Sequence, residues 1–565
     1  MKMTGARAVL ECLKREGVDV VFGYPGGAIL PLYEEMYKDN FRHILTGHEQ
    51  GAVHAADGYA RVTGRPGVCI ATSGPGVCNM VTGIATANMD SIPMVIISGQ
   101  VPTGLIGRDS FQEADISGIT SPITKHNYLV KNAASIPRVL KEAFYIASTG
   151  RPGPVLIDIA KDALETEIYF QYPDKVHLPG YVVETAGQAY DIDRAVAMIQ
   201  HSQKPVFLVG GGVILSETTK YLEAIVDTTK IPVVTTLMGK GAIPDSHELH
   251  LGMGGMHGSY ASNKAISGCD LLIALGARFD ERLTSNADTF APNAQIIHFE
   301  IDDVEIDKII DIDLGIKGDL RWSLPIFAKK LKEGAFDYGA AFADWRHEVL
   351  SMKKSHPFAT PPRPGCISPQ SIFAAVRDIA RDDDTVAITD VGQHQMWAAQ
   401  FFTTDEPKHF ISSGGLGTMG FGLPAALGAK VACPEKTVVV FSGDGSILMN
   451  CQEFATLSEY GIDVKVIVLH NDTLGMIVQL QDFFYNHHYS QCTLNKHKNL
   501  PMLAESLGVK GYAIEKQDDL IPVLKEAFAH KGPALVDIRI SPEERVYPTV
   551  PGGKALSDMI LGGDA

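Results

Sequence analysis

Short runs of β-branched and other apolar residues recur along the chain, each followed by a glycine or proline turn and a stretch with helical periodicity. Continuous apolar runs are typical of strands buried on both faces, and their alternation with helices is typical of parallel sheets. The sequence therefore predicts an α/β protein with doubly wound parallel sheets. Its composition, 45% hydrophobic and 20% charged residues, excludes a wholly disordered or fibrous chain.

Two segments divide these runs into three sets. Residues 165–186 are polar and aperiodic, and residues 353–365 contain four prolines, so both segments are predicted linkers. A chain of 565 residues allows roughly three or four domains. Three are predicted, at 1–165, 187–340 and 366–545. The predicted strands are 18–23, 42–46, 67–72, 94–99 and 155–159 in the first domain, 206–209, 232–235, 271–275 and 295–301 in the second, and 385–389, 437–442, 464–469 and 534–538 in the third.

The net charge of −17, from 49 basic and 66 acidic residues, repels phosphate backbones and anionic lipid surfaces. No nucleic-acid or membrane partner is therefore expected. No apolar run approaches the ~18 residues that span a bilayer, and the first residues show no secretory or transit pattern, so a cytoplasmic protein is predicted. The eight cysteines form no CxxC pair and give no support to a disulfide framework or a zinc site.

Polar residues follow two consecutive predicted strands of the third domain. Asp444 lies in the sequence Gly-Asp-Gly-Ser directly after strand 437–442, and Asn471 follows strand 464–469. The carboxyl ends of neighbouring parallel strands form the edge at which such sheets bind ligands. A carboxylate and an amide oxygen suit Mg²⁺, while Gly443, Gly445 and Ser446 allow a phosphate to approach the backbone. An N-capping aspartate is the alternative, but the spacing favours a Mg²⁺–diphosphate site.

This pattern resembles the diphosphate-binding motif of thiamine-diphosphate enzymes, which opens with Gly-Asp-Gly and closes near Asn-Asn. Here the closing pair is His470-Asn471, a departure that keeps the ligand at Asn471. The resemblance implies a third metal ligand at the backbone carbonyl of Thr473. The implied metal ligands are thus Asp444, Asn471 and Thr473.

Glu49 occupies the first turn of a predicted helix after strand 42–46, in the sequence HEQGA. A carboxylate there is also favoured by the helix dipole alone. Thiamine chemistry, however, needs a carboxyl group on the pyrimidine N1′, so that the cofactor's own imine removes the C2 proton. HEQGA matches the activating glutamate of the family. In this family the pyrimidine domain of one subunit meets the diphosphate domain of another, which implies a homodimer with shared sites.

From end to end the sequence resembles the catalytic subunits of the acetohydroxyacid synthase (acetolactate synthase) family. The resemblance implies a transferase that decarboxylates pyruvate and condenses the hydroxyethyl group with pyruvate or 2-ketobutyrate, in branched-chain amino-acid biosynthesis. It also implies a homodimer or homotetramer, with a small regulatory subunit as a candidate partner. The resembling runs include FGYPGGAILPLYE, HEQGAVHAADGYAR, GQVPTGLIGRDSFQEADI, GRPGPVLIDIAKD, TTLMGKGAIP, LGMGGMHG, GARFDER, DVGQHQMWAAQFF and SGGLGTMGFGLPAALGAK.

The resemblance assigns roles to individual residues around thiamine diphosphate. Met419 is the apolar wedge that bends the cofactor, and Lys161 lies near the entry channel. Residues facing the reacting C2 atom are Gly26, Phe111 and Gln112. Residues that hold the diphosphate and the aminopyrimidine are Val391, Gly392, Gln393, His394, Gly443, Asp444, Gly445, Ser446, Asn471, Gly417 and Met476.

The central domain, by the same resemblance, is a Rossmann-like domain that binds FAD as a structural requirement. Arg278 is the expected clamp for the carboxylate of the second substrate, because a guanidinium fork suits a carboxylate. A solvated surface arginine is the alternative. The implied FAD-binding residues are Arg151, Gly210, Gly211, Thr235, Leu237, Met256, His257, Gly276, Arg278, Asp280, Arg282, Glu300 and Asp319.

Leu480 stands where the family usually carries tryptophan, which contacts the extra methyl group of the second substrate. We expect a reduced preference for 2-ketobutyrate over pyruvate and weaker binding of sulfonylurea herbicides that stack there.

Several alternatives stay open at this point. An FAD-free catabolic acetolactate synthase and a pyruvate oxidase-like relative share the thiamine motifs. A non-catalytic nucleotide-binding scaffold leaves Glu49, Asp444 and Asn471 without a role. An NAD-dependent dehydrogenase is disfavoured because no domain opens with a strand followed by GxGxxG.

Overall fold

The structure is a computed structural model that describes residues 2–360, 363–380, 384–494 and 498–562. It contains three sheets of six parallel strands each, with helices packed on them, and so confirms the predicted α/β class with three doubly wound parallel sheets. A fourth, two-stranded antiparallel sheet pairs β1 (Lys2–Thr4) with β8 (Glu167–Tyr169). None of the described helices is long and apolar enough to cross a bilayer.

The N-terminal sheet has the strand order β3-β2-β4-β5-β7-β6. Its inner strands carry the unbroken apolar runs that predicted them, because helices cover both faces. The strands are β2 (Val21–Gly23), β3 (His43–Leu45), β4 (Gly67–Ala71), β5 (Met94–Gln100), β6 (His126–Val130) and β7 (Pro154–Ala160). The helices are α1 (Gly5–Arg15), α2 (Leu30–Asp39), α3 (Glu49–Thr63), α4 (Pro75–Cys78), α5 (Val81–Met89), α6 (Ile116–Thr120), α7 (Ile136–Ser148) and α8 (Lys161–Glu165).

The central sheet has the order β11-β10-β9-β12-β13-β14. Its strands are β9 (Pro205–Val209), β10 (Val233–Thr235), β11 (His250–Met253), β12 (Leu271–Leu275), β13 (Gln295–Glu300) and β14 (Leu314–Lys317). The helices are α9 (Ala189–His201), α10 (Gly211–Leu215), α11 (Thr219–Thr229), α12 (Tyr260–Gly268), α13 (Glu281–Thr284), α14 (Leu320–Glu333), α15 (Tyr338–Ala341) and α16 (Ala343–Ser355).

The C-terminal sheet has the order β16-β15-β17-β18-β20-β19. Its strands are β15 (Thr385–Thr389), β16 (Phe410–Ile411), β17 (Thr437–Gly443), β18 (Val464–His470), β19 (Lys510–Ile514) and β20 (Ala534–Arg539). The helices are α17 (Pro369–Ile379), α18 (Gln393–Phe401), α19 (Gly422–Ala432), α20 (Glu453–Glu459), α21 (Gly475–Phe484), α22 (Leu500–Ser506) and α23 (Leu520–Ala529).

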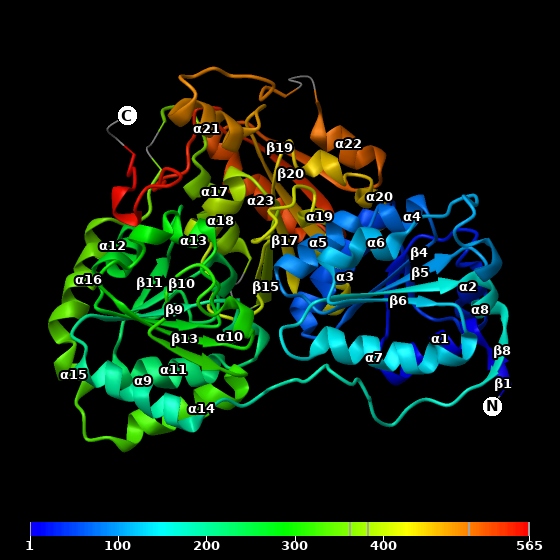
Figure 1. The fold of residues 1–565 in the computed structure, drawn as a ribbon. Helices are drawn as coiled ribbons and strands as arrows, with labels where there is room; N and C mark the ends of the chain where they lie inside the picture. Colours follow the sequence, from blue (N-terminus) through cyan, green and yellow to red (C-terminus); the bar gives the residue numbers. More distant parts are fainter. Residues whose placement is uncertain (1, 361–362, 381–383, 495–497, 563–565) are drawn as a thin grey trace.

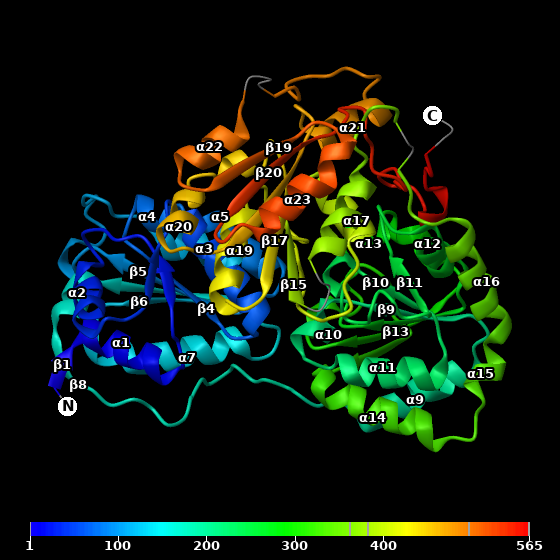
Figure 2. The same cartoon turned by 180° about the vertical axis from the view of Figure 1, so that it is seen from behind.

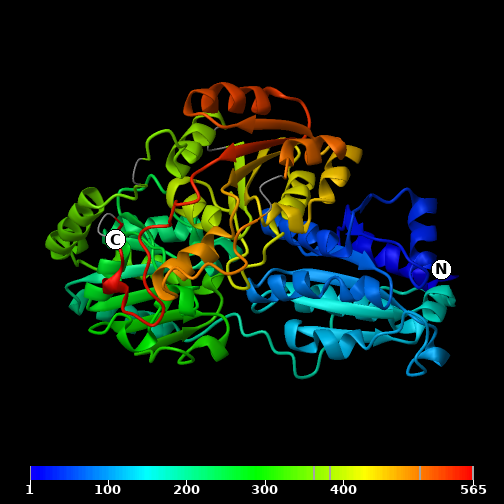
Figure 3. The ribbon, with the colours of Figure 1, turned by 90° about the horizontal axis from the view of Figure 1, so that it is seen from above.

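The three sheets occupy three parts of the molecule, with the C-terminal sheet between the other two (Figures 1 and 2). Residues 170–188 run along the outside from the first part to the second as an extended segment without helix or strand (Figure 2). Most of the first predicted linker is therefore a connection, although residues 167–169 belong to β8. The second predicted linker includes residues 361–362, which lie outside the described residues. The last described residues pass from the C-terminal part over the central part (Figure 3).

Helices α3 and α19 pack against each other and join the N-terminal and C-terminal parts in one core. Small residues make this close approach feasible. A Cβ placed on Gly58 would lie 2.0 Å from the carbonyl oxygen of Ala425, and one on Gly428 would lie 1.7 Å from that of Ala55. Backbone atoms thus touch where a methyl group would not fit.

We expect Gly58→Ala to lower the stability of the protein by about 1–3 kcal/mol, because overpacking forces the two helices apart. Gly104→Ala is the matched control, since no atom lies within 4 Å of a Cβ placed there. The thermal unfolding midpoint measures the effect. Equal midpoints for the two variants would show that the contact between α3 and α19 accommodates the added methyl group without loss of stability.

Candidate active site

Three neighbouring strands of the C-terminal sheet end at the same edge. β17 pairs with β15 on one side and with β18 on the other, and Gly443 lies opposite Leu469. Asp444 directly follows β17, and Asn471 directly follows β18. Val391 is separated from the end of β15 by one residue. Gly392, with φ of 151°, adopts backbone geometry that favours glycine and leads into α18. The edge thus gathers the predicted diphosphate residues.

A cavity of about 700 Å³ opens at this edge and extends to the central domain. One lobe, the thiamine lobe, is lined by the predicted diphosphate and aminopyrimidine residues, all of which contribute, together with Met419 and Thr473. The other, the flavin lobe, is lined by these predicted FAD residues: Arg151, Gly210, Gly211, Leu237, Met256, His257, Gly276, Arg278, Asp280, Arg282, Glu300 and Asp319. A single cavity therefore unites two predicted sites from different domains.

The thiamine lobe has oxygen donors that fit a hard cation. The Asp444 carboxylate is buried, and its Oδ2 atom forms an ion pair with the Lys498 ammonium (2.8 Å). The Asn471 amide oxygen accepts a hydrogen bond from the Thr473 N–H (3.0 Å), which orients the side chain. A buried carboxylate and a fixed amide oxygen are ligands that suit Mg²⁺.

Two histidines lie beside these donors with different environments. Burial lowers the pKa of His394 to about 3, so its ring is neutral. Burial also disfavours the charged form of His470, but its hydrogen bond to Asp537 (2.8 Å) and the charges of Asp537 and Asp444 outweigh burial and raise its pKa. His470 Nε2 lies 3.5 Å from Asp444 Oδ2. His470, the residue that departs from the family pattern, therefore places a ring N–H group beside the predicted metal ligand Asp444.

Glu49 begins α3 at the carboxyl edge of the N-terminal sheet. Its carboxylate is 9% exposed and accepts a hydrogen bond from Asn79 Nδ2 (2.9 Å). A Cβ on Gly76 would lie 3.3 Å from Glu49 Oε1 and 2.7 Å from Thr72, and a Cβ on Gly26 would also touch Thr72. Glu49 and Gly26 thus both lie close to Thr72, but neither lines the cavity that contains Asp444.

Arg278 follows β12 and projects from the central domain. Its side chain is half-buried and lines the cavity. Within the described part of the chain no carboxylate lies within ion-pair distance of it, whereas Arg151 pairs with Glu305 (2.8 Å) and Asp302 (3.3 Å). Arg278 therefore presents an uncommitted guanidinium to whatever enters the cavity.

Comparison with known proteins places this geometry in a family. Residues 3–119, 192–326 and 390–538 match the N-terminal TPP binding, central and C-terminal TPP binding domains of thiamine pyrophosphate enzymes. The chain is 48% identical over 565 residues to an acetolactate synthase of Mycobacterium bovis, covering 99% of this chain and 91% of that protein. The chain belongs to the acetolactate synthase large-subunit family.

Relatives outside the mycobacteria show similar identity. An acetolactate synthase large subunit of Corynebacterium glutamicum is 45% identical over 566 residues, which is 99% of this chain and 90% of that protein. A probable acetolactate synthase large subunit of Methanocaldococcus jannaschii is 46% identical over 575 residues, 99% of this chain and 95% of that protein. The resemblance to thiamine-diphosphate enzymes inferred from motifs is thereby confirmed over the full length.

The remaining predicted residues lie outside the cavity. Phe111 is 88% exposed, and Gln112 lies beside Gly74 near the Glu49 edge. Lys161 begins α8 and lines a separate shallow groove with residues of α2. Leu480 on α21 is 41% exposed. The Thr235 hydroxyl forms a hydrogen bond with His250 Nε2 (3.1 Å) and does not line the cavity. Its neighbour Thr236 does.

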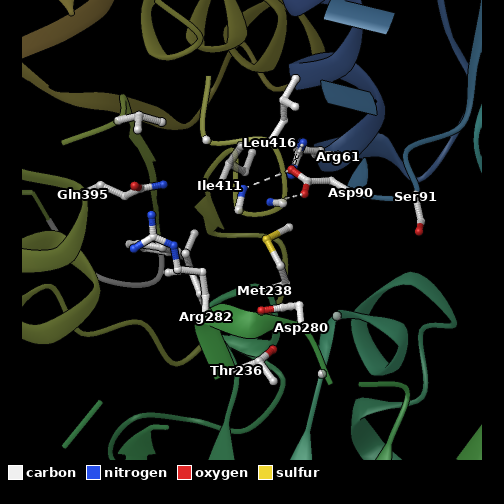
Figure 4. A pocket seen from close by; sticks show the side chains of 18 of the residues that line it. Arg61, Asp90, Ser91, Thr236, Met238, Asp280, Arg282, Gln395, Ile411 and Leu416 are labelled. Atoms are coloured by element: carbon white, nitrogen blue, oxygen red, sulfur yellow. Dashed lines mark hydrogen bonds and ion pairs between the residues drawn. The ribbon is translucent and has the colours of Figure 1, made fainter. Parts of the chain in front are cut away.

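Sequence reasoning missed several residues of the site. Asp390 is fully buried after β15 and accepts hydrogen bonds from the N–H groups of Val391 (2.9 Å) and Gly420 (2.8 Å), and burial raises its pKa to about 6. Its position directly after a predicted strand was an available signal. Asp390 lies behind the cavity lining, whereas Arg61 and Asp90 line the cavity itself (Figure 4), and no local pattern indicated them.

Proposed function

We propose that the chain is the catalytic subunit of an acetolactate synthase. It decarboxylates pyruvate and joins the two-carbon fragment to pyruvate or 2-ketobutyrate, giving acetolactate or acetohydroxybutyrate for branched-chain amino-acid synthesis. The observation that supports this proposal is the single cavity, which is lined both by Arg278 and by the residues proposed to hold a metal-bound diphosphate. Family membership supports the same activity.

The cofactors are proposed to be thiamine diphosphate, Mg²⁺ and FAD. Thiamine diphosphate, when bound, supplies a carbanion that adds to the keto group and accepts the electrons released with CO₂. Asp444, Asn471 and the Thr473 carbonyl would hold Mg²⁺ and, through it, the diphosphate. Gly417 and Met476 would hold the aminopyrimidine. A Cβ on Gly445 would lie 4.0 Å from Met419 Cε, a position that suits an apolar wedge beside the diphosphate turn.

The reacting groups have separate tasks. Glu49 would hold a proton at the pyrimidine N1′, because its buried carboxylate is fixed by Asn79. Arg278 would bind the carboxylate of the second 2-keto acid, since a guanidinium presents two parallel donors. The flavin lobe would bind FAD in a structural role, near the carboxylates of Glu300 and Asp319.

Two copies of the chain are proposed to complete each site. In one chain, Glu49 and the cavity with Asp444 do not meet. Large apolar side chains on the Glu49 side and on α21 face outward, as expected of surfaces that a second copy covers. These are Phe111, Tyr24, Leu480 and Phe484, with exposures between 40% and 88%. A homotetramer and a small regulatory subunit are also proposed from the resemblance, and the relatives' name of large subunit supports the presence of a second, smaller subunit.

Leu480 sets an expected preference for the second substrate. We expect Leu480→Trp to raise the preference for 2-ketobutyrate over pyruvate about tenfold, because one added methyl contact is worth about 1–3 kcal/mol. The ratio of acetohydroxybutyrate to acetolactate, formed when both substrates are present together, measures this preference. Phe484→Trp, one turn further along α21 and similarly exposed, is the matched control. An unchanged product ratio in Leu480→Trp would show that residue 480 does not contact the second substrate.

An omission experiment tests the proposed activity. The purified chain is incubated with pyruvate, thiamine diphosphate, Mg²⁺ and FAD, with each omitted in turn, and acetolactate is measured. We expect activity only in the complete mixture. Full activity without FAD would favour an FAD-free catabolic synthase, and reduction of FAD by pyruvate would favour an oxidase.

A further inference from the structure

Three charged side chains are buried together between the N-terminal and C-terminal parts, and the proposed chemistry gives them no role. Arg61 on α3 contacts Asp57 Oδ1 (2.5 Å) and Asp90 Oδ2 (2.8 Å). Its side chain is 6% exposed, and those of both aspartates are 0% exposed. The Arg61 guanidinium also lies over the Phe421 ring, 5.2 Å from its centroid. Burying a charge is costly unless it is paired, and here two carboxylates share one guanidinium, so the carboxylates need further hydrogen-bond donors.

Asp90 and Arg61 both bind one segment of the C-terminal part, residues 412–418, here called the joining loop. Asp90 Oδ1 accepts the N–H of Gly415 (2.7 Å), and Oδ2 accepts that of Gly414 (3.2 Å). Arg61 donates to the carbonyl of Ser412 (2.9 Å). The two side chains therefore fix three consecutive peptide groups, and they fix them from another domain.

A neutral contact fixes the far end of the same loop. The hydroxyls of Thr86 on α5 and Thr418 are 2.7 Å apart and buried. The Thr418 N–H also donates to Ser413 Oγ (3.1 Å), which closes the loop on itself. Both ends of the joining loop are thus held by the N-terminal part.

The joining loop touches both lobes of the cavity. On the flavin side, Met238 extends from the central domain toward the loop (Figure 4), and a methyl group on Gly414 would lie 2.3 Å from Met238 Sδ. On the thiamine side, the loop continues through Leu416 and Gly417, which line the cavity. Gly414, which lies beside Met238, and Gly417, which is proposed to hold the aminopyrimidine, are thus three residues apart in one loop.

We infer that Arg61 and Asp90 are positioning residues that make the joining loop a rigid link, through which FAD in one lobe strengthens binding of thiamine diphosphate in the other. The inference rests on the proposed cofactor set and adds the physical connection between its two parts. With the loop fixed, a group bound in the flavin lobe that contacts Met238 would also restrain Gly417. With the loop released, each lobe responds alone. By linkage, the coupling acts equally in both directions.

The test measures coupling rather than activity. The dissociation constant of thiamine diphosphate with Mg²⁺ is determined by quenching of intrinsic fluorescence, with and without saturating FAD, and the ratio of the two constants is the coupling factor. We expect FAD to tighten binding about five- to tenfold in the wild-type chain. In Asp90→Asn, which keeps the size but loses the charge, we expect a factor close to one.

Asp270→Asn is the matched control. Asp270 also accepts two backbone N–H groups, those of Gln203 (2.7 Å) and Lys204 (2.8 Å), but lies away from the cavity lining. It should keep the wild-type coupling factor. If Asp90→Asn does not fold, Thr86→Val removes the neutral contact alone and should reduce the factor by about half or more.

An Asp90→Asn chain that folds and keeps the wild-type factor overturns the inference, as does a wild-type chain that binds both cofactors without coupling. If Thr86→Val is the variant used, a coupling factor equal to that of the wild-type chain likewise overturns the inference. A wild-type chain that binds neither cofactor overturns the proposed function itself, which distinguishes the two failures.

Discussion

Glu49→Gln should lower the rate of acetolactate formation about 10²–10⁴-fold, the range for removing a positioned acid–base group. Glutamine keeps the shape of the side chain and can still meet Asn79, but it cannot hold the ionisable proton at the cofactor's pyrimidine. Binding of thiamine diphosphate should change little, because the diphosphate is held elsewhere. The experiment measures kcat with saturating cofactors and, separately, the affinity for thiamine diphosphate.

The control for this variant is Glu16→Gln. Glu16 caps the C-terminus of α1, pairs with Lys141 (2.9 Å), and lies at the opposite edge of the same sheet because α1 precedes β2. It should retain the wild-type rate. Unchanged turnover in Glu49→Gln would leave the proposed chemistry without its activating group.

Asp444→Asn should weaken Mg²⁺-dependent binding of thiamine diphosphate at least about a hundredfold. Mg²⁺ is held by only one or two protein carboxylates, and this substitution removes the charged one. The effect is strengthened because Asp444 is buried, so solvent cannot compensate for the lost negative charge. A titration of Mg²⁺ at fixed thiamine diphosphate, followed by fluorescence, measures it.

Asp463→Asn is the matched control for Asp444→Asn. Asp463 immediately precedes β18 and so lies at the opposite edge of the same sheet, where it pairs with Lys465 (2.7 Å). Its Mg²⁺ titration should match that of the wild-type chain. Equal titrations for the two variants would mean that the cation binds elsewhere.

The sequence predicted inner strands well and edge strands poorly, for a physical reason. β12 and β15 agree with prediction residue for residue, because strands buried on both faces must be continuously apolar. The unpredicted strands β6, β11, β14, β16 and β19 all lie at sheet edges. In β6 and β19, for example, only the last residue is fully buried, so neither strand produces an apolar run. The domain limits 1–165, 187–340 and 366–545 stay a prediction.

The site was predictable where chemistry follows a strand directly. Asp444 and Asn471 could be inferred because consecutive parallel strands end at one edge, and the structure places them there. Arg61 and Asp90 could not, since an arginine in an amphipathic helix is usually solvated and its partner loop is distant in sequence. The flavin residues were assigned by resemblance alone, and their roles stay proposals.

The most direct test of the account asks whether a second copy completes each active site. Differently tagged Glu49→Gln and Asp444→Asn chains are co-expressed, the mixed dimers are purified, and acetolactate formation is measured. If Glu49 of one copy serves Asp444 of the other, each mixed dimer has one site with both residues intact. The purified mixed dimers should then recover about half of wild-type activity, since one of their two sites is intact. Activity no higher than that of the single variants would show that each chain builds its site alone.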